Sequence, residues 1–174
     1  SKQNMPPDSE ISPITIYVET VVSGGVSVDE LRARGIACLA FALAMNNIRP
    51  VEIYAVSPGR PDGGDSAIIA TRIASSPMDI SRAVFMLTDE AFARKLNFAA
   101  MNLLTDTNTG YISWAWNGSP DDEKYQDKMR RSLALEPQDV YISGGHLFNK
   151  LMRTNPIQWV KDMIAKHGGT QDAD

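Results

Sequence analysis

Apolar residues in this chain form short runs that are separated by turns rich in polar residues, glycine and proline. Five runs have the β-branched and aromatic character of strands: 14–18 (ITIYV), 51–57 (VEIYAVS), 66–74 (SAIIATRIA), 111–116 (YISWAW) and 140–143 (VYIS). The longer stretches between these runs repeat apolar residues at helical spacing. Strands and helices therefore alternate along the chain, which is typical of an α/β domain.

The first helix has the clearest start signal. Ser27 followed by Glu30 is a capping box, and it predicts a helix that ends near Asn46. The positions expected to face inward are Leu31, Cys38, Leu39, Ala42 and Met45. Arg32 and Arg34 are expected on the polar positions. Gly35 would allow close contact between this helix and the sheet.

Four more helices follow from caps and turns. They are expected to start at Ser76-Pro77, at Thr88-Asp89-Glu90, at Asp121 and at Asn155-Pro156. Their inward residues should be Ile80, Val84 and Leu87, then Phe92, Leu96 and Leu103, and in the last helix Ile157, Val160, Met163 and Ile164. The helix from Asp121 to Leu135 is rich in charges, so we expect it to be mostly solvated.

The order of the elements predicts how the strands pair. Residues 58–65 are too few for a crossover helix, so the strands on either side should form an antiparallel hairpin. The other connections contain helices and favour parallel pairing. We therefore expect a three-layer, mainly parallel sheet with an antiparallel edge hairpin and helices on both faces, as in Rossmann-like domains. This domain should span residues 13–169, between a flexible segment 1–12 and a disordered tail 170–174.

Charge and composition exclude several classes of function. A net charge of -4 and a pI of 5.2 are unfavourable for binding nucleic acid, which depends on Lys and Arg. No apolar run approaches the roughly 20 residues that span a bilayer, so no membrane partner is expected. The lone Cys38 cannot form an internal disulfide and should be a core residue. These features favour a soluble, cytoplasmic protein.

Two strand ends carry the residues that could bind a ligand. Ligands of open parallel sheets usually lie beyond the carboxyl ends of the strands. Here one such end continues as 19–27 (ETVVSGGVS) and the other as 143–146 (SGGH). The helix that follows the first loop could attract an anion to its N-terminus. The candidate binding residues are Glu19, Ser23, Gly24, Gly25, Ser27, Ser143, Gly144, Gly145 and His146.

Known catalytic and cofactor motifs do not fit these loops. The SGGVS segment lacks the G-x-G-x-x-G spacing of dinucleotide sites, and no Gly-Lys-Ser/Thr follows a strand. Ser23 has no hydrolase frame around it. A hard cation would find only Glu19 and Asp29 near the first loop. We therefore expect no catalytic residue, no metal site and no cofactor.

Two other groups of residues have simpler interpretations. His146 could be a polar group at the strand ends or a solvated loop histidine, and His167 is expected to complement the dipole of the last helix. Trp114 and Trp116 share one strand face and could stack on bases. Aromatic residues in a strand of an acidic protein are more often part of the core, which is the interpretation we favour.

Several segments resemble a von Willebrand factor A-like domain: ITIYVET, SGGVS, DELRARGIACLAFALAM, VEIYAVS and DVYIS. The chain is also similar to an uncharacterised family of tailed-phage proteins with a degenerate version of that domain, through ARGIACLAFALAMNNIRPVEIYAVS, DEAFARKLNF, LALEPQDVYISGG and NPIQWVKDMIAKHG. In von Willebrand domains a metal-dependent adhesion site begins with D-x-S-x-S. Here Glu19 or Thr20 occupies the acidic position, and the two-serine spacing is missing. The resemblance thus implies a domain for protein contacts without an intact metal site.

Three functions follow from these observations. The first is a non-catalytic protein-interaction module of a phage protein, with a protein partner, in the host cytoplasm or the virion. The second is an enzyme or binder of small anions or nucleotides that uses the helix N-terminus at residues 23–27. The third is a structural component of a phage particle. The absence of a catalytic motif favours the first, and the enzyme stays the main alternative.

Overall fold

The computed structural model describes most of the predicted domain. The described residues are 13–20, 26–61, 67–75, 77–89, 91–96, 99–100, 103, 112–113, 122–145 and 149–169. The segments 1–12 and 170–174, which the sequence predicts to be flexible and disordered, lie outside this part. So do Trp114 and Trp116. None of the helices in the described part of the chain combines the length and the apolar character that a bilayer-spanning segment requires.

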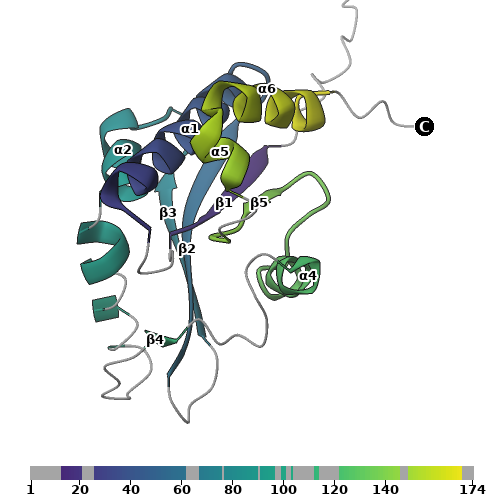
Figure 1. Ribbon diagram of the computed structural model, residues 1–174. Coiled ribbons are helices and arrows are strands. Elements are labelled where there is room, and N and C mark those ends of the chain that lie inside the picture. Colours follow the sequence, from purple (N-terminus) through teal and green to yellow (C-terminus); the bar gives the residue numbers. More distant parts are fainter. Residues whose placement is uncertain are drawn as a thin grey trace, which may run out of the picture.

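A mixed sheet forms the centre of the domain, with the strand order β3-β2-β1-β5 (Figure 1). Its strands are β1 (Ile14–Glu19), β2 (Val51–Pro61), β3 (Ala67–Ala74) and β5 (Val140–Ile142). β1 pairs in parallel with β2 and with β5, and β2 pairs antiparallel with β3. The predicted three-layer α/β architecture with an antiparallel edge hairpin is thereby confirmed.

The hairpin is longer than the sequence predicts. β2 continues through 58–61, a segment expected to be loop, and its Pro58 and Gly59 pair with Ile68 and Ala67 of β3. Proline fits at this place because β1 ends opposite Val56, so beyond that point β2 is no longer flanked by β1. Further along, β4 (Ile112–Ser113) pairs with β2 at residues 60–61 in antiparallel orientation, so the parallel pairing expected for this strand is wrong.

In the described part of the chain, one face of the sheet is covered by four α-helices, α1 (Val28–Asn46), α2 (Ile80–Thr88), α5 (Lys150–Thr154) and α6 (Pro156–His167), and the short π-helix η1 (Ala91–Leu96) adds Phe92 to the same core. The alternate side chains of β1 point toward them, so Ile14, Ile16 and Val18 are buried in the main core. Phe41 of α1 meets Trp159 of α6 edge to face, with ring centroids 6.0 Å apart. This layer contains the larger part of the hydrophobic core.

The other face of the sheet is covered, among the described residues, by α4 (Glu123–Ser132) (Figure 1). Its Tyr125 and Met129 are buried against Val56 of β2 and pack beside Tyr17 and Tyr141. The helix is therefore not only a solvated element, as its charges suggest. It supplies the third layer of the domain.

The first helix confirms the predicted capping box. The Ser27 hydroxyl accepts from the Glu30 amide at 3.2 Å, and a Glu30 carboxylate oxygen accepts from the Ser27 amide at 3.0 Å. The five predicted inward residues are all buried, Cys38 among them. The prediction for Arg34 is wrong, because its side chain is only 3% exposed. It lies three residues after Leu31 and four before Cys38, which places it on the inward face.

Gly35 makes a close contact, but with another helix instead of the sheet. A Cβ at this position would lie 2.3 Å from the carbonyl oxygen of Leu87 and 2.7 Å from the side chain of Thr88. Both residues belong to the last turn of α2. Glycine therefore allows the end of α2 to pack directly on the backbone of α1.

The later helices differ from prediction in their starts and faces. α2 is capped by Asp79, whose carboxylate accepts from the Arg82 amide at 3.0 Å, so it begins at Ile80 and not at Ser76-Pro77. Of the residues predicted to face inward, Ile80, Val84, Leu96, Leu103 and Ile157 are exposed. Residues that the pattern did not select are buried instead: Ala83, Met86 and Trp159. Asn155 caps α6 as predicted.

Candidate functional site

The two candidate loops start from neighbouring strands. β1 and β5 are paired in parallel, with Tyr17 opposite Tyr141 and Val18 opposite Ile142. Their carboxyl ends therefore lie side by side, and the amide of Gly144 donates to Glu19 Oε2 at 3.0 Å. This junction brings together Glu19, Ser143, Gly144 and Gly145. The candidates Ser23, Gly24, Gly25 and His146 lie outside the described residues.

Glu19 is the central group of this junction. Its side chain is fully buried, and Tyr141 Oη donates to Oε2 at 2.6 Å while Tyr125 Oη donates to Oε1 at 3.1 Å. Burial raises the pKa of the Glu19 carboxyl, although the donors Tyr141 and Gly144 and the charge of Arg34 oppose this. Burial and the neighbouring carboxylate also raise the pKa of both tyrosine hydroxyls. Glu19 is thus an internal acceptor closed off from solvent.

Arg34 crosses from α1 to the end of β5. One of its guanidinium nitrogens, Nη2, donates to the carbonyl oxygens of Ile142 at 3.3 Å and Ser143 at 3.0 Å, and Nε donates to Asn149 Oδ1 at 3.2 Å. The Asn149 amide in turn donates to the carbonyl oxygens of Ser143 and Gly145. This network restrains the backbone at residues 142–145, because several hydrogen bonds hold its carbonyl oxygens in place.

Ser27 is also engaged within the protein. Its hydroxyl and its amide both bond with Glu30, so a carboxylate lies at the N-terminus of α1. The Ser27 donors and the ion pair with Arg153 hold the pKa of Glu30 below its ordinary value. A bound anion would therefore meet a negative charge at the position where the helix dipole could attract it.

The donor sets do not favour a metal ion. The described part of the chain contains no group of three or more His, Cys, Asp or Glu side chains that could hold one. Both oxygens of Glu19 already accept hydrogen bonds from protein donors. A cation at this place would have to compete with Tyr125, Tyr141 and Gly144, so the arrangement is that of a structural junction.

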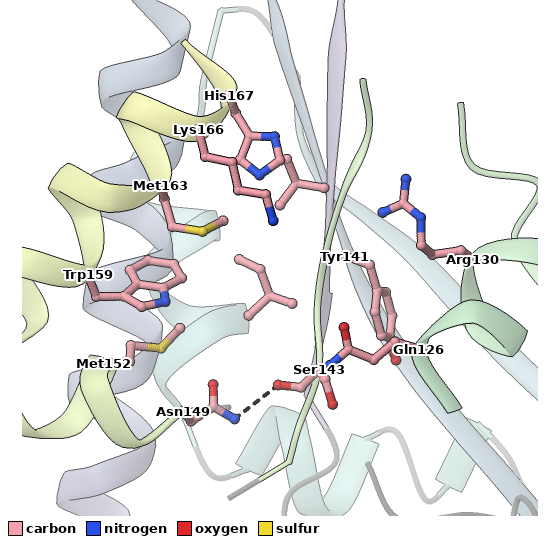
Figure 2. Close-up of a pocket in the computed structure, with 12 residues that line it drawn as sticks. Gln126, Arg130, Tyr141, Ser143, Asn149, Met152, Trp159, Met163, Lys166 and His167 are labelled. Atoms are coloured by element: carbon pink, nitrogen blue, oxygen red, sulfur yellow. Dashed lines mark hydrogen bonds between the residues drawn. The ribbon is translucent and has the colours of Figure 1, made fainter. Parts of the chain in front are cut away.

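An open groove of about 320 Å³ begins at this junction and follows β5 (Figure 2). At one end it is lined by Ser143 and Asn149, and at the other by Lys166 and His167. Trp159 lies on one side of the strand and Arg130 of α4 on the other. The groove thus connects the candidate residues to a surface that sequence reasoning did not identify.

His167 differs from the expected dipole partner. It lies in the last turn of α6 as predicted, with its ring centroid 6.1 Å from that of Phe41. Burial, followed by the charges of Lys166 and Arg130, lowers the pKa of its imidazole. A neutral imidazole interacts weakly with a helix dipole, so Lys166 is the stronger partner in this turn.

Four residues of the junction were missed by sequence reasoning: Arg34, Tyr125, Tyr141 and Asn149. For Arg34 a signal existed, because its spacing from Leu31 and Cys38 places it on the buried stripe of α1. Tyr141 and Tyr125 required knowledge of which strand and helix lie beside Glu19. That information depends on tertiary packing.

These features define the class of the protein as a Rossmann-like α/β domain with a buried polar junction where its parallel strands end. More particularly, the chain belongs to the family described as a domain of unknown function (DUF7192), whose family model matches residues 7–171. No curated protein and no solved structure matches the chain.

Proposed function

We propose that this domain is a non-catalytic protein-interaction module with a metal-free, von Willebrand A-like fold. The observation that carries the proposal is the open groove along β5, which begins at the strand ends. The neighbouring junction is occupied by bonds within the protein, so among the described residues we take the groove as the surface open to a partner at this end of the sheet. We place the contact with a protein partner there.

The alternative of an anion-binding enzyme is less well supported. It requires a free helix N-terminus after residues 23–27 and an acid-base group at Glu19 or His146. Ser27 and Glu30 bond to each other at that terminus, and Glu19 is fully buried. A general acid or base must reach the proton that it transfers, which a carboxylate enclosed by two tyrosines cannot do in this arrangement.

The proposed setting is a phage-encoded protein that acts in the host cytoplasm or in the virion. Its support is the resemblance of the segments named above to tailed-phage proteins with a degenerate von Willebrand A-like domain. A structural component of the particle is the second alternative. Stable self-assembly of the purified chain would favour that alternative over a module for a different partner.

If the domain is metal-free and non-catalytic, metal ions and nucleotides should not change its melting temperature in a thermal-shift screen. With Mg²⁺, Mn²⁺, Ca²⁺, Zn²⁺ or a panel of nucleotides, we expect the melting temperature to stay within about 1 °C of its value in buffer, because a ligand present at 100 times its Kd would raise it several times more. A rise that saturates with one metal or nucleotide would contradict the proposal. It would instead favour a ligand site at residues 19–27.

The position of the contact surface can be tested with two matched variants. Met163→Lys places a charge in the apolar wall of the groove, and Ile36→Lys makes the same kind of change on α1 at a position that is 61% exposed. Circular dichroism and melting curves would confirm that both variants fold. Mass spectrometry of proteins that co-purify with each variant then measures partner recovery.

We expect a specific partner to be recovered with the wild type and with Ile36→Lys, and to fall at least fivefold with Met163→Lys. The physical reason is that a buried Lys ammonium without a counter-charge opposes any apolar contact there. Equal recovery with all three proteins would place the contact surface elsewhere.

A further inference from the structure

The groove runs along the outer edge of the strand β5. β5 is the last strand in the order β3-β2-β1-β5, and no strand in the described ranges pairs with its outer side. Val140, Tyr141, Ile142 and Ser143 all line the groove. Successive side chains of a strand point to opposite faces, so a groove that touches four successive residues follows the edge of the strand.

The two sides of this edge differ in chemistry (Figure 2). On the side of α5 and α6, the side chains of Met152, Trp159 and Met163 form an apolar wall. On the other side lie Gln126 and Arg130 of α4. An extended segment placed against β5 would therefore have one row of side chains on an apolar surface and the other row beside polar groups.

The charged groups of the groove all have the same sign. Arg130 and Lys166 line it beside the neutral imidazole of His167, and no Asp or Glu does. Within the described residues neither cation forms an ion pair with a carboxylate. Asp139 precedes β5, and its carboxylate accepts hydrogen bonds from the amides of Thr15 and Glu136. A chain of net charge -4 thus has a basic site at this edge.

Arg130 is held in place for such a contact. Its Nη1 donates to the carbonyl oxygen of Asp139 at 3.2 Å and its Nη2 to that of Glu136 at 3.4 Å. The guanidinium is therefore positioned at the start of β5 without an ion pair to an acid among the described residues. Fixing the cation in advance lowers the entropy lost when an anion binds.

From these observations we infer that the groove binds an extended, acidic peptide segment of a partner protein, which adds as a strand to the outer edge of β5. The inference rests on the proposed function and specifies its partner. Val140 and Ile142 turn their backbone groups toward β1, and the carbonyl oxygens of Asp139 and Ser143 are already bound by Arg130 and Arg34, so pairing is expected at Tyr141. Backbone bonds supply part of the affinity, and the basic groups select acidic side chains.

A second copy of the chain fits this edge less well. Symmetric pairing of two β5 edges is antiparallel, so Arg130 and Lys166 of each chain would lie toward Ser143 and Asn149 of the other and would meet no acid in its groove. An acidic segment instead matches the charge of the groove.

The test uses the full chain and a displayed library of random twelve-residue peptides. We expect the selected peptides to be enriched at least twofold in Asp and Glu, with apolar residues at alternate positions. Binding of a selected peptide, measured by fluorescence anisotropy, should weaken at least tenfold in the double variant Arg130→Gln/Lys166→Gln. The matched double variant Arg131→Gln/Lys161→Gln removes two exposed cations outside the groove and should change binding less than twofold.

Strand addition has its own signature, because only alternate amides of a strand face one neighbour. N-methylation of one alternating set of peptide amides should weaken binding at least tenfold, whereas methylation of the other set should have little effect. The backbone amide signal of Tyr141 should shift and exchange more slowly when the peptide binds, whereas the amides of Val140 and Ile142, which face β1, should change less. Lys166→Gln alone, which disturbs no hydrogen bond described above, provides a milder variant should Arg130→Gln unfold the chain.

The possible failures are distinguishable. Four results would each overturn the inference. Three of them bear on acidic selection: no enrichment, enrichment of neutral or basic peptides, and equal effects of the two double variants. The fourth, insensitivity to N-methylation, bears on strand pairing. If partner recovery still falls with Met163→Lys, the interaction module stands and only the strand mode is wrong. If a partner is recovered equally with all variants, the groove is not the contact surface. Competition by a DNA or RNA oligonucleotide at equal affinity would also overturn the peptide specificity.

Discussion

Replacing Glu19 with Ala is expected to lower the free energy of unfolding by about 3–5 kcal/mol, as when one partner of a buried charged network is removed. The variant would leave the hydroxyls of Tyr125 and Tyr141 and the amide of Gly144 without their shared acceptor. It would also remove the carboxyl group that lies near the buried guanidinium of Arg34. Urea denaturation monitored by circular dichroism measures this change.

Glu19→Gln is the matched control, because it keeps the volume and one acceptor oxygen. Its oxygen can accept from Gly144 and Tyr141, and its amide nitrogen can donate to Tyr125, so we expect a loss of only about 1 kcal/mol. Equal losses for the Ala and Gln variants would contradict a specific role for the hydrogen bonds. Little loss for either variant would show that the junction contributes little to stability.

The wild type and Glu19→Gln also give a test of how the stability of the junction depends on pH. The pKa of Glu19 in the folded state is raised above its ordinary value of 4.5, so the folded state binds the proton more strongly than the unfolded chain. The resulting stabilisation is complete below the unfolded pKa and is lost as the pH rises through the folded pKa. The wild type should therefore lose stability relative to Glu19→Gln as the pH rises from 4.5. A difference independent of pH would contradict the raised pKa.

Replacing Gly35 with Ala is expected to destabilise the domain by about 3 kcal/mol, at the upper end of the usual cost of overpacking. An alanine in the middle of a helix is normally more favourable than glycine by about 1 kcal/mol. Here its Cβ would lie 2.3 Å from the Leu87 carbonyl oxygen, which belongs to the backbone and cannot rotate away. The helices α1 and α2 would have to separate.

Gly169→Ala provides the control for this prediction. A Cβ at Gly169 would meet no atom within 4 Å, so we expect its melting temperature to stay within about 1 °C of the wild type. Melting curves of the two variants measure both effects. A Gly35→Ala variant as stable as the wild type would mean that α2 can shift without loss of packing.

Local sequence patterns predicted the strands and the first helix because their signals are short in range. The apolar run at 14–18 and the Ser27–Glu30 capping box act within a few residues, and both are confirmed. The faces of the later helices depend on their neighbours. Ala83 faces inward because the end of α2 packs on Gly35, and this contact cannot be derived from the spacing of apolar residues in α2 alone.

The candidate site was only partly predictable. Glycines after β1 and β5 indicated where the strand ends would meet, and the bond from Gly144 to Glu19 shows that they do. The partners of Glu19 come from α4 and β5, more than a hundred positions along the chain, so no local pattern connects them. The groove depends on β5 being the outer strand, which follows from the strand order and not from its three residues.

The unequal covering of the two faces of the sheet has a consequence for how the domain opens. In the described part of the chain, α1, α2, η1, α5 and α6 share the main core with β1, whereas α4 holds the opposite face through Tyr125 and Met129. Detachment of α4 would expose the small cluster and leave the larger one intact, so sub-global opening at α4 should require less free energy than complete unfolding. The same helix carries Arg130, so movement of α4 away from the sheet would change the width of the groove.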